Sequence, residues 1–463
     1  MMQRLVLAFL LVLATLPAAA APAAPPVHEY RLDNGMKVIV KEDHRAPVFV
    51  SQVWYKIGSS YEEAGRTGLS HLLEHMMFKG TRAHGPGEFS RIVAELGGTE
   101  NAFTGRDYTA YFETLSVQHL ERALELEADR MRNLVFDEKE FQKERAVVME
   151  ERRMRTDDSP TGLTYEQLMA VGWRASPYQN PVIGWMDDLE HMKKADLKRW
   201  YDMWYQPNNA TLVVVGDVDP QQVLALAKKH FGPIPAGGVP EPRQPVEPKQ
   251  RGITRVVVKA PAKQPYLIMG FKTPVVGHAD KEWEPYALAV AAAVLDGGAS
   301  ARLARELVRR QKIAASAGAS YDVYARLPSM FLFDGSPTEG HTTEEVEQAL
   351  RREIRRLQEA PISAEELQRV VTQAVADKVY QADSIFYQAM QIGMLETIGL
   401  DWRLLDEEIA RLRAVTPEQV QAVARKYLVE DNLTVATLVP QPVRKGARAG
   451  RAVPVTKGVM HGD

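Results

Sequence analysis

The chain has 463 residues, 45% hydrophobic and 25% charged, which is a globular composition and a length for about two to four domains. Lys and Arg (57) do not outnumber Asp and Glu (60), so the charge balance argues against nucleic acid as a partner. The lack of cysteine excludes a disulfide framework and a cysteine-linked lipid anchor.

The first 21 residues have the pattern of a secretory signal peptide. A single arginine precedes an apolar run from Leu5 to Leu16, and a small-residue exit follows, with cleavage expected near Ala20 or Ala21. The run is too short to span a bilayer comfortably, and no later apolar run is long enough. We therefore expect export to a bacterial periplasm and no membrane association after cleavage.

Strands and one apolar helix are expected next. Residues 30–41 predict two strands around an Asp-Asn-Gly turn, and 47–57 predict a third. The apolar composition of 68–78 predicts a helix that is buried on most sides.

That helix contains His71, Glu74 and His75. Residues at i, i+3 and i+4 share one helix face, so two imidazoles and a carboxylate should converge. Paired imidazoles four residues apart can bind Zn²⁺, and the carboxylate between them is placed to take a proton from a zinc-bound water. The order His-x-x-Glu-His is the reverse of the commoner His-Glu-x-x-His. The alternative is a helix with merely hydrogen-bonded histidines, but burying this cluster without a cation would be unfavourable.

Further along, a helix is expected at 89–96, a hairpin at 99–104 and 108–114, and helices at 117–133 and 138–155. A catalytic zinc requires a third protein ligand, and the last of these helices offers the better candidates for it.

Glu144 and Glu151 are seven residues apart and should share a helix face. Val147 and Val148 lie between them and suggest that this face is buried. One carboxylate could bind the metal while the other holds a ligating histidine in its tautomer. Spacing does not choose between Glu144, Glu150 and Glu151.

The remainder of the chain repeats this plan. We expect a first α+β domain at 27–235, a Pro/Gly-rich linker at 236–250, a second α+β domain at 251–440 and a basic tail at 441–463. The interval from Pro47 to Asn209 nearly equals that from Pro265 to Asn432. The second copy has no histidine at the corresponding position, so only the first should hold metal.

These motifs resemble the pitrilysin family of zinc peptidases, which includes insulin-degrading enzyme and mitochondrial processing peptidase. The similarity covers the Asp-Asn-Gly-Met turn, the His-x-x-Glu-His helix, the ERxxxxEE segment, the Asn-Ala-Phe-Thr strand, the Pro-Asn-Asn strand and the duplicated half. The resemblance implies an α+β tandem duplication that forms half of a clam-shell chamber. It implies a zinc endopeptidase with one Zn²⁺ per chain.

The resemblance also implies residue roles. His71, His75 and Glu151 would be the zinc ligands, Glu74 the general base and Glu144 a supporting carboxylate. The edge strand with Asn101, Ala102, Phe103 and Thr104 would bind extended peptide substrates through its main chain.

One departure from the family pattern suggests a partner. Family members often carry an Arg and a Tyr in the second repeat that stabilise the reaction intermediate, and Ala315 stands in the place of that Tyr. Alanine donates no hydrogen bond to an oxyanion. The chain therefore resembles the metal-bearing subunit of a heterodimer with a homologous metal-free subunit, rather than a homodimer. Alternatively, Tyr321 or Tyr324 could replace the family tyrosine that is missing at Ala315. The alternative function is a non-catalytic binding or assembly subunit, which usually lacks the metal residues present here.

Overall fold

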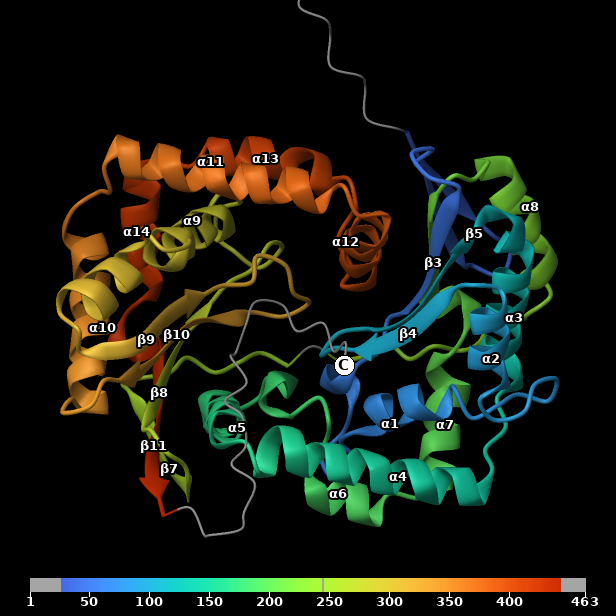
Figure 1. The fold of residues 1–463 in the computed structure, drawn as a ribbon, viewed down its shortest axis with the longest axis horizontal. Coiled ribbons are helices and arrows are strands. Elements are labelled where there is room, and N and C mark those ends of the chain that lie inside the picture. The colour runs from blue at the N-terminus through green and yellow to red at the C-terminus, as the bar shows by residue number, and fades with distance from the viewer. Residues whose placement is uncertain (1–25, 244, 443–463) are drawn as a thin grey trace, which may run out of the picture.

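The computed structural model describes residues 26–243 and 245–442 as two α+β halves, each built on one sheet (Figure 1). The predicted signal peptide lies outside the described residues, as does the predicted basic tail from 443 onward. The domain boundaries proposed from the sequence stay a prediction. In the described part of the chain, we find no helix with the length and apolar character needed to cross a bilayer.

The first half contains a six-stranded sheet with the order β1-β2-β6-β3-β5-β4. Strands β2 and β6 are parallel, and the other neighbours are antiparallel. Its elements are β1 Val27–Arg31, β2 Lys37–Glu42, β3 Val48–Tyr55, η1 Ser59–Tyr61, α1 Leu69–Met76, α2 Glu88–Glu95, β4 Thr99–Thr104, β5 Thr109–Ser116, η2 Val117–His119, α3 Leu120–Asn133, α4 Glu138–Arg152, η3 Arg153–Asp157, α5 Pro160–Gly172, η4 Pro177–Gln179, α6 Met186–His191, α7 Lys194–Trp204, η5 Pro207–Asn209, β6 Ala210–Gly216 and α8 Pro220–His230. Strand β4 is thus the end strand next to the helical layer.

The second half contains a five-stranded sheet with the order β7-β11-β8-β10-β9, in which β7 and β11 are parallel. Its elements are β7 Thr254–Pro261, β8 Tyr266–Thr273, α9 Glu284–Asp296, η6 Ala304–Arg310, β9 Ala314–Ser320, β10 Ser329–Pro337, α10 Thr343–Glu359, α11 Ala364–Gln381, α12 Ile385–Thr397, α13 Leu404–Arg413, α14 Pro417–Tyr427, η7 Glu430–Asn432 and β11 Leu433–Gln441. Without β1, the first sheet has this same order. The predicted α+β duplication is therefore confirmed.

The two halves exchange one helix each. Helix α12 of the second half packs on the first sheet beside β3 (Figure 1), so closely that a Cβ added at Gly393 would lie 2.1 Å from Nε1 of Trp54. Helix α5 of the first half packs on the second sheet, where Leu168 and Ile268 are both buried in one apolar cluster. Each sheet therefore needs a helix from the other half to cover it, which the sequence analysis did not predict.

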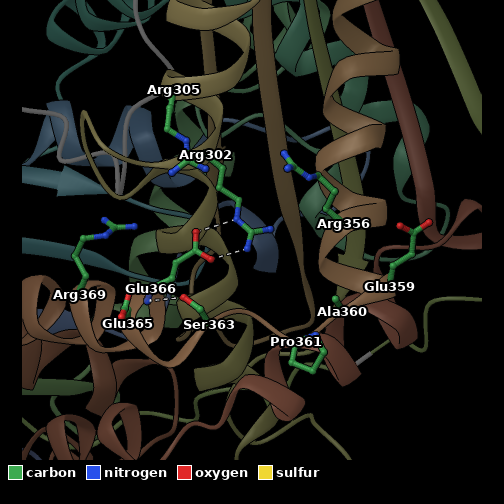
Figure 2. Close-up of a pocket in the computed structure, with 10 residues that line it drawn as sticks. All are labelled: Arg302, Arg305, Arg356, Glu359, Ala360, Pro361, Ser363, Glu365, Glu366 and Arg369. Atoms are coloured by element: carbon green, nitrogen blue, oxygen red, sulfur yellow. Dashed lines mark hydrogen bonds and ion pairs between the residues drawn. The ribbon is translucent and has the colours of Figure 1, made fainter.

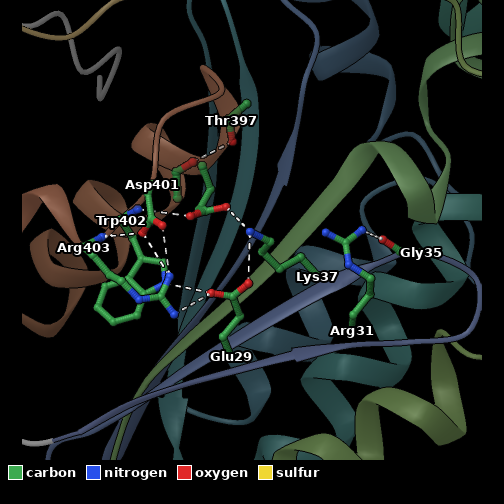
Figure 3. Close-up of polar contacts among 10 residues, drawn as sticks. Glu29, Arg31, Gly35, Lys37, Thr397, Asp401, Trp402 and Arg403 are labelled. Carbon is green, nitrogen blue, oxygen red and sulfur yellow. Dashed lines mark hydrogen bonds and ion pairs between the residues drawn. The ribbon is translucent and has the colours of Figure 1, made fainter. Parts of the chain in front are cut away.

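Polar contacts fix α12 and the following loop to the first two strands (Figure 3). Lys37 of β2 donates a hydrogen bond to Glu396 of α12 and lies 3.2 Å from Oε1 of Glu29 on β1. The indole Nε1 of Trp402 donates to Oε2 of Glu29 at 3.1 Å, and the Arg403 guanidinium stacks over the Trp402 ring. The docked helix thus has a charged rim around its apolar contact.

The helix expected at 138–155 is confirmed as α4, with its continuation as the π-helix η3. One detail of this helix was wrong. Val147 is 44% exposed rather than buried, whereas Val148 is fully buried. The buried stripe of α4 is therefore narrower than two adjacent valines suggested.

Candidate metal centre

The short helix α1 begins in a tightly fixed loop. The buried carboxylate of Glu62 accepts hydrogen bonds from the N–H groups of Gly68 at 2.7 Å and Ser70 at 2.6 Å. These are donors that the first turn of a helix leaves unsatisfied. Gly68 has φ +86°, and a Cβ there would lie 2.8 Å from the carbonyl oxygen of Ile183, so the position requires glycine. The loop therefore fixes where α1 starts.

Helices α1 and α4 bring the three predicted metal ligands together. Nε2 of His71 lies 3.7 Å from Oε1 of Glu151, and Nε2 of His75 lies 3.4 Å from Oε2 of Glu151. One donor atom from each of the three residues fits within a mutual distance of 4.8 Å. Donors about 2.1 Å from a tetrahedral zinc ion are about 3.4 Å apart. The donor set and its spacing thus fit Zn²⁺.

The two other candidate glutamates of α4, Glu144 and Glu150, differ in their surroundings. Oε2 of Glu144 lies 3.3 Å from Nδ1 of His75, the ring nitrogen that does not face Glu151, and Lys79 lies 2.9 Å from the other oxygen. This is the contact expected of a carboxylate that orients a metal-binding histidine. Glu150 is 61% exposed and pairs with Arg153, so it does not join the cluster.

The cluster changes the proton affinities of its members. Burial alone would raise the pKa of Glu151, but hydrogen bonding to His75 and the charges of His71 and Arg155 lower it to about 2. Burial would lower the pKa of His75, yet its contacts with Glu144 and Glu151 raise it to about 9. The neighbouring carboxylates thus favour the protonated form of His75, and the neighbouring cationic groups favour the ionised form of Glu151.

Glu74, the predicted base, lies on the same helix and contacts strand β4. The hydroxyl of Thr104 donates a hydrogen bond to Oε2 of Glu74. Burial raises the pKa of Glu74 to about 6, although this hydrogen bond works in the opposite direction. A carboxyl group with a pKa near neutrality is suited to accept and return a proton.

The predicted substrate strand, β4, pairs with β5 on one side and forms the end of the sheet. Ala102, Phe103 and Thr104 are buried, whereas Asn101 is exposed. Oδ1 of Asn101 accepts a hydrogen bond from the N–H of Ala102 at 2.8 Å. One main-chain N–H of the edge strand, that of Ala102, is therefore already hydrogen-bonded to the Asn101 side chain.

A cavity of about 600 Å³ lies elsewhere, between η6, α10 and α11 (Figure 2). Four arginines and three glutamates line it, and Arg302 forms two hydrogen bonds with Glu366. Arg356 is likewise bonded to Glu353 behind the wall. The lining has one arginine more than it has glutamates, but Arg302 and Arg356 are already paired with carboxylates, so the cavity has no strong charge excess.

Sequence reasoning missed three contacts of the metal cluster. These are the ion pair of Arg155 with Glu151 at 2.8 Å, the contact of Lys79 with Glu144, and the hydrogen bond from Thr104 to Glu74. A spacing of four residues relates Arg155 to Glu151, so helical periodicity was an available signal for that pair. Lys79 lies beyond the end of α1 and reaches Glu144 on another helix, so no local pattern indicated that contact. No local pattern relates Thr104 to Glu74.

Comparisons with known proteins agree with this architecture. Residues 37–185 match the family described as Insulinase (Peptidase family M16), and 191–374 match the Peptidase M16 inactive domain. The sequence is similar to Zinc protease PqqE of Helicobacter pylori, with 36% identity over 78% of this chain and 81% of the relative. It is also similar to the uncharacterized zinc protease YmxG of Bacillus subtilis, with 27% identity over 88% of this chain and 96% of the relative.

Solved structures give the same result. A protease from Helicobacter pylori superimposes with a TM-score of 0.85 at 31% identity, covering 90% of this chain and all of that one. The periplasmic protease PqqL of Escherichia coli has a TM-score of 0.76 at 20% identity, covering 90% of this chain and 48% of its own, and shows the fold alone. The chain therefore belongs to the insulinase family, peptidase family M16, and its His-Glu-His cluster lies in the half that matches the Insulinase model.

Proposed function

We propose that this chain is a zinc-dependent endopeptidase that hydrolyses peptides bound in extended form. The observation that carries the proposal is the convergence of His71, His75 and Glu151 within 4.8 Å, with Glu74 on the same helix as both histidines. The naming of its relatives as zinc proteases supports it. His71, His75 and Glu151 would hold one Zn²⁺, and Glu144 would orient His75.

The residues of the chain divide the chemistry between them. A zinc ion bound here would supply an acidified water and polarise the scissile carbonyl. Glu74 would accept the proton of the attacking water and return it to the leaving amine. The substrate would add to the end strand β4 by main-chain hydrogen bonds, which requires Asn101 to release the Ala102 amide.

We further propose that a homologous metal-free subunit completes the enzyme as a heterodimer, with the two chains forming a chamber. Ala315 lies exposed on β9 and has no donor side chain. The hydroxyl of Tyr321 donates to the carbonyl oxygen of Pro274 at 2.6 Å, and the hydroxyl oxygen of Tyr324 is buried. The Tyr321 hydroxyl is thus already engaged and the Tyr324 hydroxyl is shielded from solvent, which supports a donor from a partner. Export to a periplasm remains part of this proposal.

The substitution Glu74→Gln tests the reaction. It should leave zinc content unchanged and abolish cleavage of a quenched peptide mixture, because an amide accepts no proton from water at neutral pH. Full activity in this variant would refute the role of Glu74. Zinc binding without any cleavage by the unmodified chain, alone or with its co-purifying homologue, would favour a non-catalytic subunit instead.

A second experiment tests the partner. The isolated chain should hydrolyse the same mixture poorly, and activity should rise when the homologous subunit is added. Size-exclusion chromatography would show whether the two chains form one complex. Strong activity of the isolated chain would contradict the need for a partner.

A further inference from the structure

The strand that is proposed to hold the substrate also contacts the proposed base. Thr104 is the last residue of β4, and its hydroxyl donates to Oε2 of Glu74 on α1. The threonine is 2% exposed, so its hydroxyl has little access to water as an alternative partner. This hydrogen bond joins the edge strand directly to the helix that carries the histidines.

The position of Thr104 is fixed from several directions. It pairs with Thr109 across the hairpin, and the turn is closed by a hydrogen bond from the N–H of Gly105 to the carbonyl oxygen of Tyr108 at 2.8 Å. The carbonyl oxygen of Gly105 accepts a hydrogen bond from the N–H of Ser59 at 3.2 Å. A β-branched side chain in a strand has few χ1 options. The hydroxyl therefore has a defined place in the structure.

We infer that Thr104 is a positioning residue that holds the carboxylate of Glu74 for proton transfer; this inference rests on the proposed function. A glutamate has three side-chain torsions, and a base acts only within hydrogen-bond reach of the proton it takes. Because the hydroxyl engages Oε2, the other carboxylate oxygen, Oε1, would be the one to take the proton. Because Thr104 belongs to β4, the substrate and the base are aligned by one rigid element.

Three variants test this role. Thr104→Val removes the hydroxyl and keeps the side-chain size, Thr104→Ser keeps the hydroxyl, and Thr109→Val is the matched control. Thr109 is the cross-strand neighbour, and its buried hydroxyl donates to the carbonyl oxygen of Ile57 at 2.9 Å instead of to Glu74. Each variant is measured for zinc content, for kcat and KM with its partner subunit, and by crystallography.

Thr104→Val should lower kcat about ten- to a hundredfold with KM and zinc content unchanged, the size expected when a reacting group shifts by about 1 Å. Thr104→Ser should recover kcat to within about threefold, and Thr109→Val should retain it. In crystals of Thr104→Val, with or without zinc, the Glu74 carboxylate should occupy more than one position.

Two results would overturn the inference. One is an unchanged kcat in Thr104→Val while Glu74→Gln is inactive, which leaves the proposed function standing. The other is a Glu74 carboxylate that keeps its position in crystals of Thr104→Val. The crystallographic result decides the positioning role even if the unmodified chain proves inactive and the proposed function fails.

Discussion

The loss of one arginine between the two halves should destabilise the whole molecule. Arg326, in the connection between β9 and β10, places Nε 3.2 Å from Oδ1 of Asp107 and Nη2 2.7 Å from Oγ of Ser60. The side chains of Arg326 and Asp107 are 8% and 6% exposed. The guanidinium also lies 4.1 Å from the ring centroid of Tyr61. Arg326→Ala would leave the carboxylate of Asp107 buried without its cation.

Removing one partner of a buried ion pair costs about 3–5 kcal/mol of the free energy of unfolding. For a chain of this length, about 1–2 °C per kcal/mol gives a fall in Tm of roughly 3–10 °C. Thermal unfolding followed by circular dichroism measures this shift. The control is Arg91→Ala, because Arg91 is 56% exposed and pairs with Glu95 within one helix, where an ion pair contributes under about 1 kcal/mol.

The reasoning would be refuted if Arg326→Ala and Arg91→Ala lowered Tm equally. A double variant provides a further check. Asp107→Ala combined with Arg326→Ala should cost less than the two single changes added together, because neither buried charge then remains unpaired.

Three further predictions concern a helix contact, the metal and a helix cap. Gly393→Ala should lower the free energy of unfolding by about 1–3 kcal/mol in urea titrations, although alanine favours helices, because its Cβ would overlap Trp54; an unchanged midpoint would contradict the docking of α12. The pKa of His75 is raised to about 9, so below that pH zinc must displace a proton from this histidine. Chelator competition should therefore show a zinc affinity that rises up to about tenfold per pH unit from pH 6.5 to 8.5. A zinc affinity that does not change with pH would contradict this. Asp137→Ala removes the cap that accepts from two N–H groups at the start of α4, and should cost about 1 kcal/mol with zinc affinity retained; loss of zinc would show that the cap positions the ligands.

The repeated strand motifs predicted the duplicated fold, and local periodicity predicted which side chains of one helix lie together. The spacing of His71 and His75 placed both imidazoles on one face of a helix. It was harder to predict which of the adjacent residues Glu150 and Glu151 faces the histidines. Successive helical residues point about 100° apart, and the spacing does not show which direction faces α1. Only the packing of α4 against α1 separates Glu151, beside the histidines, from exposed Glu150.

Contacts between distant segments could not be predicted from the sequence. The apolar character of 385–397 indicates a buried helix, but it does not indicate which sheet that helix covers. Similarly, Thr104 was predicted only as part of a substrate strand, because its contact with Glu74 depends on how the sheet lies over the helix. Such contacts are set by tertiary packing rather than by spacing.

The exchange of α5 and α12 has a consequence for how the molecule tolerates being cut. Consider a protease that cuts the chain in the predicted linker, 236–250. Helix α5 would still cover the second sheet and α12 would still cover the first, so the two fragments would stay bound to each other. If one fragment were expressed alone, the apolar face of its sheet would be exposed to solvent. A gene split at this point would therefore yield products that survive only when co-expressed.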